Sequence, residues 1–137
     1  MAGYSGTPLP KKLGMKEGHR VALLNPPDGL AGTLGALPDG VRPQLGLKGK
    51  SPLDVVVLFV TRAADLQRQL APVRRRMSPA ASFWVAWPKK ASGVPTDVTE
   101  DVVRAIALPT GLVDNKVCAI DETWSGLRLV IRLENRR

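Results

Sequence analysis

The run LDVVVLFV, residues 53–60, limits the fold of this chain more than any other stretch. Valines dominate the run, and β-branched residues favour a strand over a helix. After Asp54 no polar residue alternates with the apolar ones, so both faces of the strand have to be covered by other elements. Strands of this kind are typical of parallel sheets packed between helices.

Two further stretches have the same character. Residues 21–24, VALL, form an apolar run of strand length that is closed by a turn containing two prolines and a glycine. Residues 82–87, SFWVAW, form another, which ends at Pro88. The segment 38–52 is rich in Pro, Gly and Lys, and we interpret it as a loop with a short edge strand around residues 41–45.

Helical patterns separate these strands. The segment 62–77 places four apolar side chains on one helical face, and Pro72 is expected to kink or break this helix. The four are Leu66, Leu70, Val73 and Met77. Weaker patterns occupy residues 28–40, where glycines disfavour a helix, and residues 7–14. In the latter, Thr7 is the expected N-cap, Pro8 the first helical residue and Gly14 the stop.

The segment 97–107 has clear helix start signals. Asp97 is the expected N-cap and Glu100 follows three residues later. An apolar stripe is formed by Val98, Val102 and Ile106. After this helix, KVCAID, ETWSG and LRLVIRL are typical of strand, tight turn and strand, which predicts an antiparallel hairpin.

The order of elements predicts the fold class. Strands alternate with helices and a hairpin follows, which indicates an α/β protein with a mostly parallel sheet and helices on both faces. We therefore expect a single Rossmann-like domain over residues 1–137, with the antiparallel hairpin at its C-terminal end.

A ligand of such a sheet is expected beyond the carboxyl ends of its parallel strands. Asn25 follows the first strand and Arg62 the second, whereas Trp87, Lys89, Lys90 and Ser92 follow the third. Arg62 and the two lysines could meet an anionic group, with backbone N–H groups of the next helix start assisting. Trp87 could stack on a base or sugar. The alternative is that the lysines are merely solvated where the strand ends.

The charge of the chain also favours anionic partners. Its net charge is +8, and residues 1–96 carry 14 basic and 5 acidic side chains, against 6 and 7 in residues 97–137. Nucleic-acid binding through Lys11, Lys12, Lys16 and the arginines at 74–76 is one explanation. It is not favoured, because the few aromatic residues fall mostly in strands and leave no basic, aromatic platform.

Catalytic and cofactor motifs are missing. The turn NPPDGLAG after the first strand is not a GxGxxG motif, and its prolines remove backbone donors, so no dinucleotide or S-adenosylmethionine cofactor is expected. Asn25-Pro26-Pro27 resembles the Asn-Pro-Pro-aromatic loop of amino-group methyltransferases. However, Asp28 replaces the aromatic residue, and the tripeptide follows the first strand rather than the middle one. We interpret it as a turn.

Other kinds of chemistry find few candidates. His19 is the single histidine and precedes the first strand, away from the expected site, and Cys118 is interpreted as a packing residue. No metal site is expected. Asp114, Asp121 and Glu122 are the remaining candidates for acid–base work, although DETWSG is better interpreted as a hairpin loop in which Trp124 covers the sheet edge.

At YSGTPLPKKLG, WVAWPKKASG and GLVDNKVCAIDETWSGLRLVIR the chain resembles a chiefly actinobacterial family of domains of unknown function, number three thousand and fifty-two in that series. The resemblance spans nearly the whole chain and implies a small, stand-alone, cytoplasmic protein with no established activity. The family often has an acidic residue and an aromatic where this chain has NPPDGLAG. The element order is also similar to the later half of Rossmann-like methyltransferases, in which a strand opening with Asp, like Asp54 here, precedes helix, strand, helix and hairpin.

These observations favour a non-catalytic Rossmann-like module that binds an anionic small molecule or a protein partner at the carboxyl edge of the sheet. A nucleic-acid-binding protein and a diverged methyltransferase-like enzyme are the alternatives. The single cysteine excludes an internal disulfide, and no signal peptide or apolar run of membrane-spanning length is recognised, so a cytoplasmic location with no membrane partner is expected.

Overall fold

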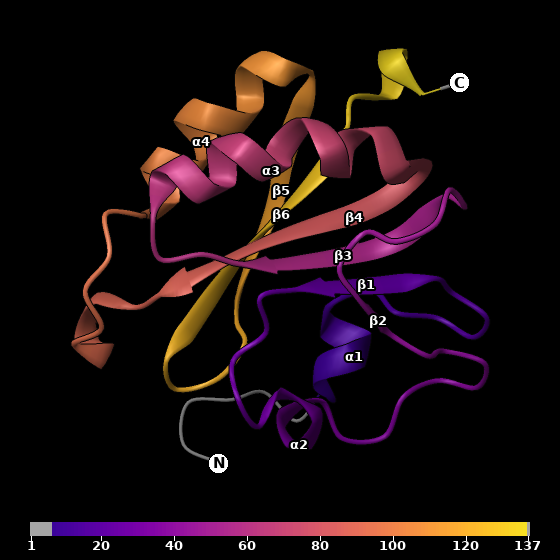
Figure 1. Cartoon of the computed structure of the whole chain (residues 1–137), viewed down its shortest axis with the longest axis horizontal. Coiled ribbons are helices and arrows are strands. Elements are labelled where there is room, and N and C mark those ends of the chain that lie inside the picture. The colour runs from indigo at the N-terminus through magenta and orange to yellow at the C-terminus, as the bar shows by residue number, and fades with distance from the viewer. Residues whose placement is uncertain (1–6, 137) are drawn as a thin grey trace.

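The computed structural model describes residues 7–136 and is built around a six-stranded sheet in the order β2-β1-β3-β4-β6-β5 (Figure 1). The strands are β1 (Val21–Leu24), β2 (Gln44–Leu45), β3 (Leu53–Phe59), β4 (Met77–Pro88), β5 (Leu112–Ala119) and β6 (Trp124–Ile131). The first four pair in parallel, and β6 runs antiparallel to both β4 and β5. The predicted α/β class, with a mostly parallel sheet and a C-terminal antiparallel hairpin, is confirmed.

The helices differ greatly in length. They are α1 (Leu9–Lys12), α2 (Leu30–Leu34), α3 (Ala63–Arg76) and α4 (Glu100–Ala107), with short 3-10 turns at Lys90–Ser92, Leu108–Thr110 and Leu133–Asn135. In α1 the N-cap is Pro8 rather than Thr7, and Gly14 follows the helix with φ +84°. No helix within residues 7–136 is long and apolar enough to cross a membrane.

The core consists of two apolar clusters that the sheet separates. Along β3, successive side chains alternate between them: Val56 and Leu58 belong to one cluster, and Val55 and Val57 to the other. All four are essentially inaccessible to solvent. This explains why the strand sequence shows no polar alternation.

Each cluster is completed by different helices. Leu66, Leu70 and Val73 of α3, with Val103 and Ala107 of α4, pack in the first cluster. Leu9 of α1 and Leu30 and Leu34 of α2 pack in the second. Figure 1 shows α3 and α4 together on one side of the sheet, and α1 and α2 on the other side.

Two expectations about helices are corrected by the structure. Pro72 does not end α3, which continues to Arg76 because the apolar side chains flanking the proline are buried against the sheet. The buried residues of α4 are Val103 and Ala107, whereas Val102 of the expected stripe is only half-buried, and the N-cap lies two residues later than expected.

Two tryptophans join distant segments on the second side of the sheet. The indole Nε1–H of Trp84, in the centre of β4, donates a hydrogen bond of 2.9 Å to the carbonyl oxygen of Leu13. Trp124, at the start of β6, meets Phe59 edge-to-face with 5.1 Å between ring centroids. Trp124 therefore packs over the sheet at its carboxyl edge.

Candidate functional site

The carboxyl ends of β1, β3 and β4 lie side by side at one edge of the sheet. Leu24 pairs with Leu58, and Leu58 with Val85, so β1 and β3 end beside each other and β4 extends a few residues beyond them. The residues that follow them therefore leave the sheet at this same edge, which we call the carboxyl edge. Asn25, Arg62 and Lys89 are each within three residues of a strand end there.

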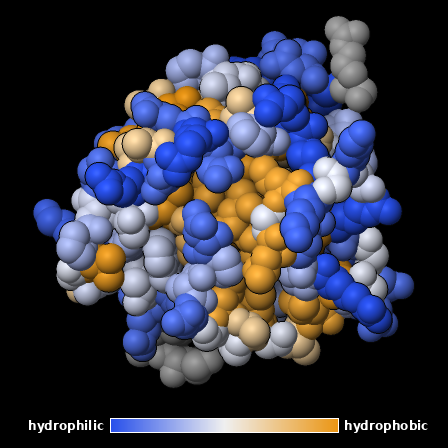
Figure 2. Space-filling model, in the orientation of Figure 1, coloured by the Kyte–Doolittle hydropathy of each residue, from blue (hydrophilic) through white to orange (hydrophobic). Residues whose placement is uncertain are grey.

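A hollow of about 510 Å³ opens at the carboxyl edge between the ends of β1 and β2 and the helix α3. Its lining is mostly apolar, and polar side chains enter from Asn25 and from Gln69 of α3. We call it the edge hollow; its other lining residues are Leu23, Leu24, Pro26, Leu45, Gly46 and Leu47. Figure 2 shows hydrophobic surface in the middle of the face that carries α3, with hydrophilic residues around it.

A second hollow of about 610 Å³ adjoins the first, because Leu23, Pro26 and Leu45 line both. It extends along α2, where Leu30 and Leu34 contribute to its wall. Leu45 stands between the two hollows on the two-residue strand β2, and its side chain is 69% exposed. An exposed leucine on an edge strand is a natural contact for an apolar ligand or partner.

Asn25 adopts a left-handed backbone conformation with φ +54°, the one non-glycine residue with positive φ within residues 7–136. Asn tolerates this conformation better than most residues, because its short polar side chain interacts locally. The conformation turns the chain sharply after β1 and leaves the Asn25 side chain exposed at the rim of the edge hollow.

The remaining residues of the predicted site do not line the edge hollow. Lys89 Nζ donates to the carbonyl oxygen of Asp121 at 2.8 Å, so this lysine fastens β4 to the β5–β6 hairpin. Ser92 Oγ donates to the carbonyl oxygen of Lys89 at 2.7 Å and accepts from the N–H of Val94 at 3.2 Å. Trp87 is only 7% exposed and packs in the first cluster. Arg62 and Lys90 are exposed.

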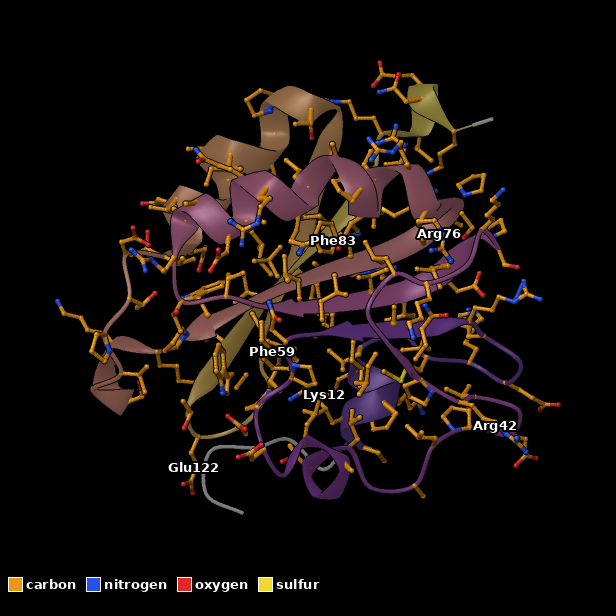
Figure 3. The ribbon with its side chains drawn as sticks, in the orientation of Figure 1. Lys12, Arg42, Phe59, Arg76, Phe83 and Glu122 are labelled. Atoms are coloured by element: carbon orange, nitrogen blue, oxygen red, sulfur yellow. The ribbon has the colours of Figure 1, made fainter. Side chains whose placement is uncertain are left out.

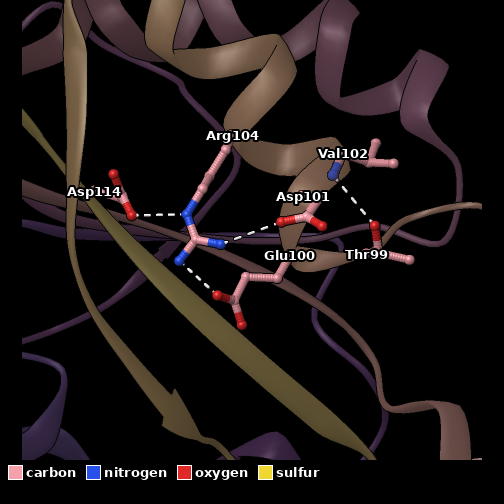
Figure 4. A network of polar contacts seen from close by, with 6 residues as sticks. All are labelled: Thr99, Glu100, Asp101, Val102, Arg104 and Asp114. Carbon is pink, nitrogen blue, oxygen red and sulfur yellow. Dashed lines mark hydrogen bonds and ion pairs between the residues drawn. The ribbon is translucent and has the colours of Figure 1, made fainter.

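The helix starts at this edge are capped by side chains. Asp97 does not cap the helix that follows it: its Oδ1 accepts a 2.7 Å hydrogen bond from the N–H of Ala63, the first residue of α3. Thr99 caps α4 instead, by accepting from the N–H of Val102 at 3.2 Å (Figure 4). Some of these N–H groups already donate hydrogen bonds to side-chain oxygens of the protein. Fewer of them are therefore available to bind an anion than the sequence predicted.

The carboxylates considered for acid–base work have structural partners. Asp114 Oδ2 accepts a 2.8 Å hydrogen bond from Arg104 Nε, which lowers the pKa of Asp114 below its usual value (Figure 4). Asp121 Oδ1 accepts from the backbone N–H groups of Thr123 and Trp124, both at 2.8 Å, and so closes the hairpin turn. Among the described residues, no group of three or more His, Cys, Asp or Glu side chains could hold a metal ion.

The loops at the carboxyl edge do not fit an adenosine cofactor bound in the usual Rossmann manner. Pro26 and Pro27 offer no N–H after β1, and α2 has only five residues, so its N-terminus contributes little to the binding of a charged group. Leu45 is the last residue of β2, a position where dinucleotide-binding domains usually have a carboxylate that binds the ribose hydroxyls. The edge hollow is suited to a different recognition chemistry.

The sheet order, with β6 inserted antiparallel between β4 and β5, gives a Rossmann-like fold that is similar to that of methyltransferases of known structure. Similar solved structures include an S-adenosylmethionine-dependent methyltransferase from Aquifex aeolicus, with TM-score 0.61 and 16% identity, covering 88% of this chain and 87% of that one. A ribosomal protein L11 methylase from Lactobacillus delbrueckii subsp. bulgaricus has TM-score 0.60 and 11% identity, covering 90% and 74%.

Fibrillarin from Aeropyrum pernix, solved with natively bound S-adenosyl-L-methionine, has TM-score 0.58 and 14% identity, covering 93% of this chain and 70% of that one. At these identities the likeness shows the fold and not the activity. No protein-family model matches the chain, and no curated protein is significantly similar to it in sequence. The resemblance to a family of unknown function therefore stays a prediction.

Sequence reasoning placed Asn25, Arg62 and Lys89 at one edge of the sheet, as the structure does, but it did not identify most residues of the edge hollow. Leu45, Leu47 and Gln69 come from a two-residue strand, the following loop and the middle of α3. No local motif marks them, because the hollow arises only when α3 packs across the sheet beside the end of β2. Asn25 is the lining residue that the sequence could indicate, because it directly follows a predicted strand.

Proposed function

We propose that this chain is a non-catalytic, small-molecule-binding module of the methyltransferase fold, with its site in the edge hollow. The observation that carries the proposal is the composition of this hollow: an apolar lining with two amide side chains, Asn25 and Gln69, at the edge where ligands of such sheets bind. Its volume of about 510 Å³ suits a small metabolite.

The lining specifies the chemistry of the ligand. The leucines favour an apolar or planar body, which would be removed from water on binding. The amides of Asn25 and Gln69 offer both donors and acceptors to a carbonyl, amide or ring nitrogen. An anionic group on the same ligand would stay at the open side of the hollow. A cation on α3 that could approach it is the N-cap Arg62, which precedes Gln69 by two turns, about 10 Å along the helix axis.

The absence of methyl transfer is part of the proposal. It rests on the prolines after β1 and on Leu45 at the end of β2, which leave the described edge without the usual backbone cradle and ribose-binding carboxylate. The proposal includes a cytoplasmic location, because a free cysteine such as Cys118 is typical of proteins in a reducing compartment.

Thermal unfolding of the full chain with a panel of nucleotides, cofactors and uncharged and phosphorylated metabolites tests the proposal. A ligand of the edge hollow at a hundred times its Kd should stabilise the protein by about 2.7 kcal/mol. Asn25→Gly, which keeps the left-handed backbone accessible while removing the amide, and Gln69→Ala should both weaken that stabilisation. Gln67→Ala, on an exposed position of the same helix, is the matched control. A panel without a single stabilising ligand would contradict small-molecule binding.

A diverged methyltransferase-like enzyme is the second candidate, and the fold neighbours favour it. Isothermal calorimetry with S-adenosylmethionine distinguishes the two. The non-catalytic proposal predicts no micromolar binding. Micromolar binding that Asn25→Gly abolishes would instead assign the edge hollow to this cofactor and make the enzyme the better explanation.

A further inference from the structure

Another hollow lies at the opposite edge of the sheet, where β1 and β3 begin and α3 ends. Its volume is about 450 Å³, and cationic side chains line it from four separate segments: Arg20, Arg42, Lys48 and Arg76. We call it the basic hollow. Figure 3 shows Arg42 and Arg76 on the side of the molecule where these strands begin, away from Glu122 in the hairpin loop.

The charge of the basic hollow is not neutralised by carboxylates. No Asp or Glu is among its described lining residues, and none of its four cations forms an ion pair within residues 7–136. Asp54 lies nearby, but it accepts from the backbone N–H of Arg20 and from Ser78 Oγ, not from a guanidinium. Four like charges around one concavity create a positive potential that attracts anions.

Arg76 prearranges the wall of this hollow. Its guanidinium donates to the carbonyl oxygens of Leu47 and Ser51, the latter at 2.8 Å from Nη2 and 3.1 Å from Nε. These bonds hold the loop between β2 and β3 against the end of α3, and with it Lys48. Arg76 thus contributes charge and rigidity, while Arg20, Arg42 and Lys48 are exposed and available for direct contact.

His19 also lines the same hollow. Its Nδ1 accepts a hydrogen bond of 3.1 Å from the backbone N–H of Lys16, which leaves Nε2 as the ring nitrogen that can donate. Gly18 and Gly40 also line the hollow, with φ +74° and +77°, and the backbone at Gly40 passes close to that at Gly18. A Cβ atom at Gly40 would contact the backbone of Gly18, whereas one at Gly18 would meet nothing within 4 Å, so the space beside Gly18 is open.

We propose that the basic hollow binds the phosphate or diphosphate group of a small metabolite. Arginine guanidinium groups match phosphate oxygens with paired hydrogen bonds, and two of them, with Lys48, reach this hollow from different segments. The volume holds a diphosphate with part of the molecule that carries it. The site is separate from the edge hollow and does not depend on the function proposed for it.

The geometry favours a small molecule over a nucleic acid. The four cations converge on one concavity instead of forming a stripe along the surface, and no Phe, Tyr or Trp is among the described lining residues, so His19 has the single aromatic ring there. A nucleic acid would engage many scattered cations, with binding that weakens steeply as salt is added.

The experiment is a titration of the ¹⁵N-labelled full chain with inorganic pyrophosphate at low salt, followed by amide chemical shifts. The shifts should be confined to residues of the basic hollow, such as Gly18, Arg20, Gly40 and Arg42, and should be absent at Asn25 on the carboxyl edge. Arg20→Gln and Arg42→Gln should each weaken the affinity about tenfold, as expected for the loss of a hydrogen bond between charged groups.

Lys50→Gln is the matched control. Lys50 is an exposed cation in the loop between β2 and β3, which also carries Lys48, but Lys50 does not line the hollow. It should leave the pyrophosphate affinity unchanged, and thermal unfolding should show that all three variants remain folded. No shifts at millimolar pyrophosphate would overturn the proposal. Equal weakening of binding by Lys50→Gln and Arg42→Gln would also overturn it. So would a DNA duplex that bound through the same residues more tightly than pyrophosphate. In either case the surface would be a diffuse site for polyanions.

Discussion

Asp97 Oδ1 accepts a hydrogen bond from the backbone N–H of Ala63 at 2.7 Å, although the two residues are 34 positions apart in the chain. A second bond, from Thr96 Oγ1 to the carbonyl oxygen of Thr61 at 2.7 Å, lies beside it. The loop that leads into α4 is thereby joined to the start of α3. The connections that follow β3 and β4 are consequently held together at the carboxyl edge.

Asp97→Ala should destabilise the protein by about 1 kcal/mol, the usual cost of losing a helix cap. Asp97→Asn should cost less, because its amide oxygen can still accept the bond from Ala63. Urea unfolding at neutral pH measures both values. Asp101→Ala is the control, since the Asp101 side chain is 96% exposed and its 3.5 Å ion pair with Arg104 is long. Equal losses for Asp97→Ala and Asp101→Ala would show that the cap contributes little.

The capping pattern illustrates where sequence reasoning ends. Asp97 and Thr99 both satisfy the rules for an N-cap residue, and Asp97 has Glu100 at the spacing of a capping box. In the structure Thr99 caps α4, and Asp97 accepts a hydrogen bond from the first residue of α3. This assignment depends on two helices lying side by side, and no local pattern records that contact.

The strands were predictable for the opposite reason. The run 53–60 has to be buried on both faces wherever it lies, so its sequence alone indicates a central strand. The role of Lys89 was not predictable, because its bond to the carbonyl oxygen of Asp121 requires the hairpin to fold back beside β4. A lysine after a strand resembles a ligand contact until its partner in the fold is known.

The bond between Arg104 and Asp114 predicts a pH dependence of stability. The guanidinium lowers the pKa of the Asp114 carboxyl in the folded protein. A depressed folded-state pKa stabilises the protein above the unfolded-state pKa of about 4, and this stabilisation is lost as the pH falls through the lower folded-state value. The free energy of unfolding of the native chain should therefore exceed that of Asp114→Asn at neutral pH, and the gap should shrink below about pH 4.

Urea unfolding of the two proteins at a series of pH values measures this gap. Asp28→Asn is a suitable control, because Asp28 is exposed and forms no described ion pair or side-chain hydrogen bond. Its difference from the native chain should stay small throughout. A gap for Asp114→Asn that is unchanged at the acid end of the series would mean that the charge of Asp114 is not what stabilises the fold.

Trp84→Phe should destabilise the protein by about 1–3 kcal/mol, because the buried carbonyl oxygen of Leu13 loses the indole donor. The bond joins the segment after α1 to the centre of the sheet, so the N-terminal segment should become more accessible as well. Trp87→Phe is the matched comparison on the same strand: no hydrogen bond of the Trp87 indole is described within residues 7–136, and its loss should be smaller. Hydrogen exchange at Leu13 and Met15 measures the local effect, and an unchanged exchange rate there would contradict it.

Gly126 and Gly32 predict opposite effects for the same substitution. A Cβ atom at Gly126 would lie 3.1 Å from Trp84 Cε3 and 3.2 Å from Ile120 Cδ1. Trp84 is fully buried and cannot move aside, so Gly126→Ala overpacks the core and should cost about 1–3 kcal/mol. At Gly32, inside α2, a Cβ atom would meet nothing within 4 Å, and the backbone does not have positive φ.

Gly32→Ala should therefore stabilise the protein by about 0.5–1 kcal/mol, since alanine loses less conformational freedom than glycine when a helix forms. The two single variants and the double variant, compared by urea unfolding, give the complete test. The double variant should show the sum of the two changes, because Gly32 on α2 and Gly126 on β6 share no described contact. Stabilisation by Gly126→Ala would mean that β6 can move away from Trp84, and the close packing of the hairpin against the second cluster would then be wrong.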